Sequence, residues 1–128
     1  MRKIKFRGKI DDNWWYTSPR DDNWEQFWNI VDIDTVCQFT GVCDNSNKEI
    51  YEKDIVNIVD SGDYNDLLND NPKLFGKIGE IFYSTCYFSV AVKGCDFYDL
   101  WEFVGHNEGV SLIVIGNIYE NETLVCKT

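Results

Sequence analysis

One segment, residues 38–56, constrains the fold more than any other part of this 128-residue chain. It reads QFTGVCDNSNKEIYEKDIV, so a glycine and a run of Asp, Asn and Ser separate two apolar stretches. Asp and Asn tolerate left-handed backbone and bond their own main chain, which predicts a turn at 44–47. The β-branched residues that follow predict a strand over 54–59. The segment is therefore dense in polar residues for structural reasons, and it contains no catalytic motif.

The composition favours a folded, β-rich chain. Hydrophobic residues make up 44% of the positions, which is too apolar for an intrinsically disordered protein. The many aromatic side chains (5 Trp, 7 Tyr and 8 Phe) favour strands, because flat rings fit the pleated face of a sheet. A chain of this length can bury enough apolar surface to fold without disulfides.

Short segments of alternating or β-branched apolar residues follow one another along the chain. We expect strands at 4–10, 14–17, 31–39, 54–59, 76–83, 87–92 and 110–119. Aromatic spacing at 24–30 predicts either a helical turn or an irregular segment, and 60–72 is a long acidic surface loop. The sequence therefore predicts a mainly β chain with little helix. Its parts are an N-terminal β-hairpin lobe over 1–50 and a small closed barrel over 51–128.

The net charge of −10 is unevenly placed, because five of the twelve basic residues lie within the first nine positions. Nucleic-acid affinity needs clustered Lys and Arg for phosphate contacts, so the acidic total disfavours direct nucleic-acid binding. On a strand, the basic side chains at this end share one face, opposite Ile4 and Phe6. They are Lys3, Lys5, Arg7 and Lys9. We interpret them as a solvated strand face, with a nucleic-acid footprint as the alternative.

His106 is the only histidine of the chain. A hydrolase could use it beside a Cys or Ser nucleophile within hydrogen-bond reach. No GxSxG, HExxH or phosphate-binding glycine loop accompanies it, however. We interpret His106 as a loop residue without a catalytic role and expect no enzymatic activity.

Neither the acidic loop nor the cysteines have the spacing of a metal site. The loop lacks the glycine and the terminal glutamate of a calcium-binding loop, which predicts solvated charge at Asp60, Asp63, Asp66 and Asp70. The cysteines form no CxxC pair; they are Cys37, Cys43, Cys86, Cys95 and Cys126. We therefore expect reduced, mostly buried thiols, and no metal, disulfide or cofactor.

Four tryptophans lie within fifteen residues, among Asp and Asn: Trp14, Trp15, Trp24 and Trp28. Because Trp14 and Trp15 are adjacent on a predicted strand, their side chains must face opposite sides. A lobe of fifty residues has little core in which to hide four indoles, and exposed Trp is enriched at binding hot spots. These tryptophans are the candidate interaction surface, and the alternative is that the chain's own loops cover them.

No apolar run approaches the length of a membrane span, and the longest, 112–115, is of strand size. The basic start is not followed by the apolar core of a signal peptide. We expect a cytoplasmic protein with no membrane partner.

Three stretches of the sequence resemble the YopX family of phage and prophage proteins. They are MRKIKFRG at 1–8, the segment 38–56, and VIGNIYEN at 114–121. The family usually has Gly where this chain has Asn47 and Lys53; Asn accepts positive φ readily, whereas Lys does so reluctantly. The resemblance implies a C-terminal barrel of SH3-like type and a phage or prophage origin. It implies no activity and no catalytic residues.

Three functional hypotheses follow. The first is a non-enzymatic phage accessory protein that binds protein, both itself as a homo-oligomer and an unknown host or phage protein. The second is a nucleic-acid-directed regulator, which binds through the basic strand or mimics DNA with its acidic surface to block a DNA-binding protein. The third is an enzyme of unrecognised type that depends on His106.

Overall fold

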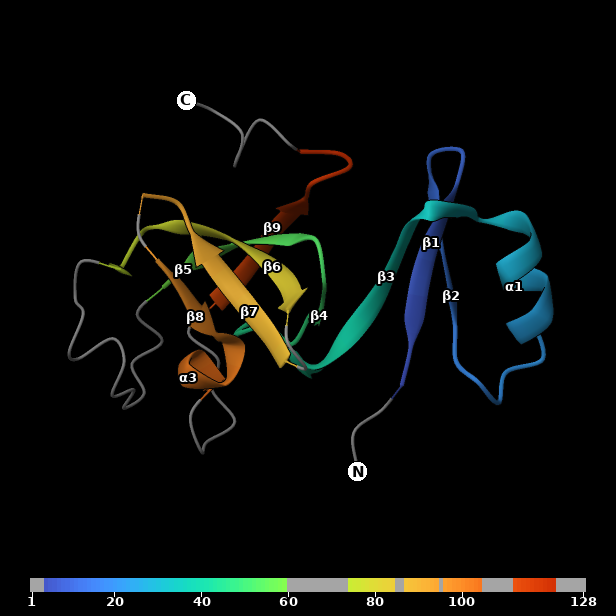
Figure 1. The fold of residues 1–128 in the computed structure, drawn as a ribbon, viewed down its shortest axis with the longest axis horizontal. Helices are drawn as coiled ribbons and strands as arrows, with labels where there is room; N and C mark the ends of the chain where they lie inside the picture. Colours follow the sequence, from blue (N-terminus) through green and yellow to red (C-terminus); the bar gives the residue numbers. More distant parts are fainter. Residues whose placement is uncertain (1–3, 60–73, 85–86, 95, 105–111, 122–128) are drawn as a thin grey trace.

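The protein is mainly β and forms two antiparallel sheets (Figure 1). The structure, a computed structural model, describes residues 4–59, 74–84, 87–94, 96–104 and 112–121. Several predictions fall outside the described residues and stay predictions. They concern Lys3, the loop 60–72 with its Asp60, Asp63, Asp66 and Asp70, the thiols of Cys86, Cys95 and Cys126, and His106.

The first sheet has the strand order β2-β1-β3-β4. Its strands are β1 (Phe6–Ile10), β2 (Asn13–Thr17), β3 (Asp32–Cys43) and β4 (Glu49–Tyr51). The predicted hairpin is confirmed, because β1 and β2 pair in antiparallel register. A helix, α1 (Trp24–Ile30), confirms the helical interpretation of the aromatic spacing. It buries Phe27 and lies on the side of this sheet that faces away from the second sheet (Figure 1).

Strand β3 links the two halves of the molecule (Figure 1). Its first part pairs with β1, where Cys37 lies opposite Arg7, and its second part pairs with β4, where Phe39 lies opposite Tyr51. The register shifts within both pairings. A long strand with such irregularities can bend and so serve two partners.

The second sheet has the order β8-β7-β6-β5-β9. Its strands are β5 (Asp54–Ile58), β6 (Ile78–Ser84), β7 (Tyr87–Val92), β8 (Phe97–Asp99) and β9 (Leu112–Asn117), with a short helix α3 (Leu100–Val104) after β8. The four strands predicted at 54–59, 76–83, 87–92 and 110–119 are confirmed. The sheet curls into a half-barrel rather than a closed barrel, since β8 and β9 are its two edges among the described strands. The SH3-like topology stays an expectation.

The larger hydrophobic core lies inside the second sheet. Its buried residues are Ile50, Val56, Ile58, Leu74, Ile81, Phe88, Val90, Val92, Leu100, Phe103 and Leu112. Ile50 comes from β4, so the last strand of the first sheet also closes the core of the second. The domain division at residues 50 and 51 stays a prediction. In the described part of the chain, no helix is long and apolar enough to cross a membrane.

Candidate functional site

The basic side chains on β1 and just before it each meet a carboxylate. Lys5 Nζ lies 3.0 Å from Glu49 Oε1, and Lys9 Nζ lies 2.7 Å from Glu120 Oε2. Arg7, between them in sequence, pairs with Asp54 at the start of β5. The lysine side chains are only 23% and 13% exposed, and that of Arg7 is 6% exposed. The predicted solvated strand face is therefore wrong for Lys5, Arg7 and Lys9, because β4, β5 and the turn after β9 each supply a carboxylate that pairs with one of them.

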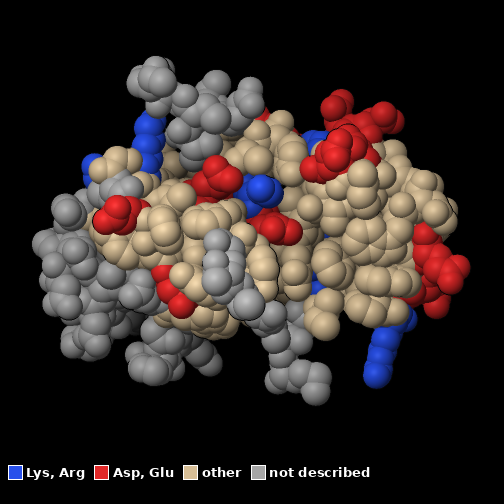
Figure 2. Space-filling model, viewed as in Figure 1, with Lys and Arg blue, Asp and Glu red and all other residues tan. Residues whose placement is uncertain are grey.

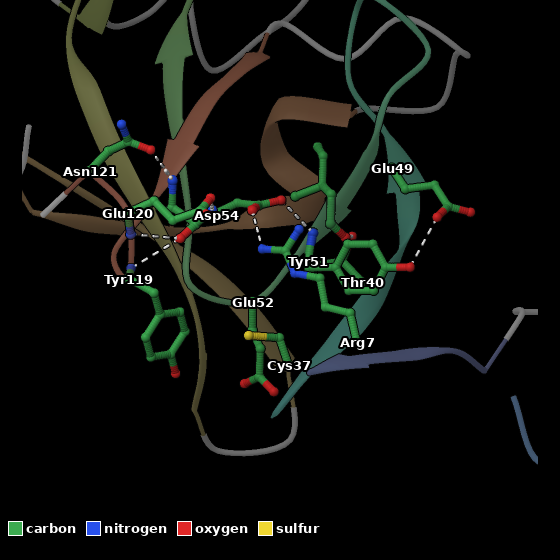
Figure 3. Close-up of polar contacts among 12 residues, drawn as sticks. Arg7, Cys37, Thr40, Glu49, Tyr51, Glu52, Asp54, Tyr119, Glu120 and Asn121 are labelled. Atoms are coloured by element: carbon green, nitrogen blue, oxygen red, sulfur yellow. Dashed lines mark hydrogen bonds and ion pairs between the residues drawn. The ribbon is translucent and has the colours of Figure 1, made fainter. Parts of the chain in front are cut away.

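The Arg7–Asp54 pair is the buried centre of this contact (Figure 3). The Asp54 carboxylate accepts a hydrogen bond from Arg7 through Oδ1 and one from the Tyr51 backbone N–H, at 2.8 Å, through Oδ2. The guanidinium carbon of Arg7 lies 4.3 Å from the Trp14 ring centroid and 4.5 Å from that of Tyr51. Two aromatic faces and one carboxylate thus replace the water that the guanidinium gives up.

The two partners respond differently to burial. Burial lowers the pKa of Arg7, but attraction to Asp54 outweighs it and the net direction is upward. Burial raises the pKa of Asp54, and Arg7 and the Tyr51 N–H oppose that rise. We take the pair as ionised at neutral pH, because both Asp54 oxygens accept N–H donors, as a carboxylate does.

Cys37 lies next to this pair on β3 (Figure 3). Its side chain is buried and Sγ donates to the Thr35 carbonyl oxygen at 3.2 Å. Burial raises the pKa of the thiol to about 11, although Arg7 acts in the opposite direction. A thiol rather than a thiolate is therefore present at neutral pH, and only the thiolate is a strong nucleophile. The site supports a structural role for Cys37.

The turn at 44–47 is built by the side chain of Asp44, as predicted. Asp44 Oδ1 accepts from the N–H groups of Ser46 (2.8 Å) and Lys48 (2.9 Å), and Oδ2 accepts from the N–H of Val114 at 2.8 Å. Asn47 adopts φ 67°, the left-handed conformation that Asn tolerates. The turn thereby connects β4 to the edge strand β9.

Lys53 adopts φ 72°, which confirms that this position requires a left-handed backbone. Its N–H donates to the Ile81 carbonyl at 2.7 Å, and its own carbonyl accepts from the Ile118 N–H at 3.0 Å. Both contacts reach into the second sheet, so the local conformation is held by distant partners. A side chain in this region of φ and ψ costs free energy that glycine avoids.

The segment after β9 completes the contact. The Asn117 side chain accepts from the N–H groups of Tyr119 (3.0 Å) and Glu120 (3.1 Å) and donates to Glu120 Oε1 at 2.8 Å. The Tyr119 ring lies edge-on to Trp14, with 6.1 Å between centroids, and its hydroxyl donates to the Asp34 carbonyl at 3.0 Å. This small turn therefore aims Glu120 at Lys9 and Tyr119 at the first sheet.

The four tryptophans of the predicted interaction surface occupy different environments. Trp14 is half-buried against Arg7 and Tyr119. Trp24 and Trp28 are half-buried beside Phe6, and the indole N–H of Trp28 is buried without a hydrogen-bond acceptor. Trp15 is 39% exposed, on the opposite face of β2 from Trp14. The structure does not bring the four indoles to one exposed patch.

An open cleft of about 860 Å³ lies beside the ion pairs. The β1–β2 turn, the junction of α1 with β3, and the turn after β9 form its walls. Its lining residues are Lys9, Ile10, Asp11, Asp12, Ile30, Val31, Asp32, Thr35, Tyr119 and Glu120. Figure 2 shows acidic side chains gathered at the end of the first sheet where the β1–β2 turn lies. Sequence reasoning missed this cleft, because its walls come from three separated segments.

A group of three or more His, Cys, Asp or Glu side chains able to hold a metal ion is absent from the described residues. The predicted absence of metals and cofactors stays a prediction. What the site does chemically is to hold two sheets together through charges that the solvent reaches poorly.

The fold and this site define a class: a two-sheet, mainly β protein whose halves are joined by ion pairs from one strand. The model of the YopX family, described as YopX protein, matches residues 1–125. The chain therefore belongs to the YopX family. The crystal structure of protein EF1440 from Enterococcus faecalis is similar at 22% identity and a TM-score of 0.46, covering 95% of this chain and 74% of that one. No curated protein matches the chain.

Proposed function

We propose that the protein is a non-enzymatic binding module for other proteins, a phage or prophage accessory protein that acts in the cytoplasm. The open acidic cleft carries this proposal. Its wall contains the carboxylates of Asp11, Asp12, Asp32 and Glu120 and a single cation, Lys9, which is paired with Glu120. Three carboxylates thus remain without a cation in the lining, which suits a partner segment rich in Lys or Arg.

The cleft also offers apolar surface. Ile10, Ile30 and Val31 belong to its lining, and Ile30 is 40% exposed. The exposed Trp15 lies opposite Gly8 in the β1–β2 pairing. Val31 packs over Gly8, because a Cβ added to Gly8 would lie 3.1 Å from the Val31 side chain. Trp15 therefore shares one side of the first sheet with Val31 of the cleft wall, whereas Lys9 and Glu120 line the cleft from the side of Trp14. Apolar surface with a charged rim is the usual composition of a protein interface.

The test compares capture by the wild-type chain with capture by two charge-matched variants. In the first, Asp11, Asp12 and Asp32 of the cleft become Asn; in the second, Asp22→Asn, Glu25→Gln and Asp96→Asn change exposed acids outside it. We expect a specific partner from host or lysogen lysate to be lost only with the cleft variant. Equal capture by all three proteins, or equal loss from both variants, would contradict the proposal.

We further propose that the protein forms a homo-oligomer through the second sheet. Phe97, on β8, is 62% exposed, and Tyr83 and Tyr87 at the β6–β7 end are 50% and 38% exposed. Because β8 is an edge among the described strands, it also presents backbone groups to a second copy. Light scattering after size exclusion should give a multimer that Phe97→Ser shifts toward monomer. A wild-type monomer at high concentration would rule out this part of the proposal.

A DNA-mimic function is the second candidate, and the acidic surface in Figure 2 favours it. The form that binds nucleic acid through the basic strand loses support, because Lys5, Arg7 and Lys9 already have carboxylate partners. A mimic would compete with DNA for a DNA-binding protein, and the competition would weaken with salt. If DNA does not compete with the protein for the captured partner, the DNA-mimic function is excluded and only the protein-binding function remains.

A further inference from the structure

A second, smaller cleft of about 190 Å³ opens where β1 and β2 meet the turn before β4. Its lining is mostly cationic and aromatic: Lys5, Arg7, Tyr16, Lys48, Glu49 and Tyr51. Three cations and one carboxylate line this cleft, in a chain whose net charge is −10. The volume is that of a few water molecules, each about 30 Å³ in the liquid, which suits a small oxyanion.

Glu49 shows what the cleft can hold. Its carboxylate accepts from Lys5 Nζ at 3.0 and 3.2 Å and from the Tyr51 hydroxyl at 3.0 Å. An ammonium group and a phenol that converge on one carboxylate form a donor set that equally fits a phosphate oxygen. The Glu49 side chain is 31% exposed, so an incoming anion can reach and replace it.

One further cation is available at this cleft. Lys48 is exposed and makes no ion pair within the described part of the chain, so its charge adds to the field of the cleft. Arg7 also lines the cleft, but it is 5% exposed and its guanidinium pairs with Asp54, so it is not counted among the donors that an anion can reach.

The aromatic lining adds a preference for the group that carries the anion. The Tyr16 and Tyr51 rings lie 5.9 Å apart, and Tyr16 is 44% exposed. Lys5 Nζ lies 5.5 Å from the Tyr16 ring centroid, so the cation and the exposed ring sit together. We propose that this cleft binds the phosphate group of a small phosphorylated molecule, with Glu49 occupying the phosphate position when no ligand is bound.

The test is a titration of the full chain with inorganic phosphate and with phenyl phosphate, followed by amide NMR shifts at constant ionic strength. Saturable shifts should centre on Lys48, Glu49 and Tyr51, and phenyl phosphate should bind more tightly because its ring can stack on Tyr16. Chloride at the same ionic strength should produce no such shifts. Inorganic phosphate that binds as tightly as phenyl phosphate would assign the site to free phosphate, and would overturn the aromatic part of the proposal.

Three single variants make the test specific. Lys48→Gln should weaken phosphate binding about fivefold, the effect of one unit charge near 4 Å in water. Glu49→Gln should strengthen it by about the same factor, because the competing charge is gone. Lys93→Gln, at an exposed lysine in the turn after β7, is the charge-matched control and should leave binding unchanged. Equal effects of Lys48→Gln and Lys93→Gln, or no saturable shift by about 10 mM phosphate, would overturn the proposal.

This inference does not rest on the proposed function, since the two clefts share no lining residue. Loss of protein capture by the Asn variants of the acidic cleft would leave the phosphate titration unchanged. A negative phosphate titration would likewise leave the capture experiment unchanged, so the two failures can be told apart.

Discussion

Arg7 and Asp54, 47 positions apart in sequence, form a buried ion pair across the boundary between the two sheets. The same carboxylate accepts the Tyr51 N–H, and the Tyr51 ring covers the guanidinium. The pair therefore joins the start of the chain to the segment that carries the YopX resemblance. The third stretch that resembles the family, 114–121, contacts the start of the chain through the ion pair between Lys9 and Glu120. Arg7, Asp54 and Glu120, one from each stretch that resembles the YopX family, each take part in one of these ion pairs.

Breaking the Arg7–Asp54 pair should strongly destabilise the fold. Asp54→Asn leaves the Arg7 charge buried without a counter-charge, and Arg7→Met does the same to Asp54. Removing one partner of a buried pair typically costs about 3–5 kcal/mol. Urea unfolding followed by tryptophan fluorescence should report a lower free energy of unfolding of this size for each variant.

The double variant Arg7→Met, Asp54→Asn is the control for this prediction. Because neither charge remains, it should lose less stability than the sum of the two single variants. Additive losses, or a loss below about 1 kcal/mol in each single variant, would mean that the pair does not join the halves as described.

Lys53→Gly should stabilise the protein. Lys53 has φ 72°, a conformation in which glycine avoids the clash that a Cβ makes. We expect a gain of about 1 kcal/mol in the free energy of unfolding, reduced somewhat by the larger entropy of glycine in the unfolded chain. Lys53→Ala changes the charge equally but keeps the Cβ, so it should give no gain. A gain from Ala equal to that from Gly would assign the effect to charge instead.

Local features of this fold follow from the sequence. The turn at 44–47, the hairpin of β1 and β2, and the strands of the second sheet all come from signals between near neighbours. The left-handed backbone at Lys53 is visible too, because the YopX resemblance places glycine there. These features depend on φ preferences and on side-chain alternation, which a single sequence displays directly.

The contacts that build the site cannot be read from neighbouring residues. Alternation predicts that Lys5, Arg7 and Lys9 share a face, but not what covers it. Their partners lie 44, 47 and 111 residues further along the chain. The tryptophans show the same limit, because Trp14 is covered by Tyr119, which comes from outside the β1–β2 hairpin. Long-range packing decides both outcomes, and periodicity carries no information about it.

Cys37 should resist alkylation in the folded protein. Burial raises the pKa of its thiol from 9.0 to about 11. At pH 8 the thiolate population is then lower by about a hundredfold, and burial blocks the reagent further. Mass spectrometry of the Cys37 peptide after iodoacetamide treatment should show labelling in guanidinium but almost none in buffer. Rapid labelling of Cys37 in buffer would contradict the buried position and would reopen a catalytic role.

The outermost ion pair should contribute stability that depends on pH and salt. Hydrogen bonds from Lys9 and Asn117 lower the pKa of Glu120, so the ionised form favours folding. The contribution is therefore fully present above the unfolded pKa of about 4.3 and is lost as the pH falls through the lower folded pKa. Because the Glu120 side chain is 41% exposed, solvent screening limits this to about 1 kcal/mol or less. The difference in unfolding free energy between wild type and Glu120→Gln should shrink as the pH falls from 6 to about 3. It should also shrink in 1 M salt. A difference that stays constant would show that the charge of Glu120 is not its source.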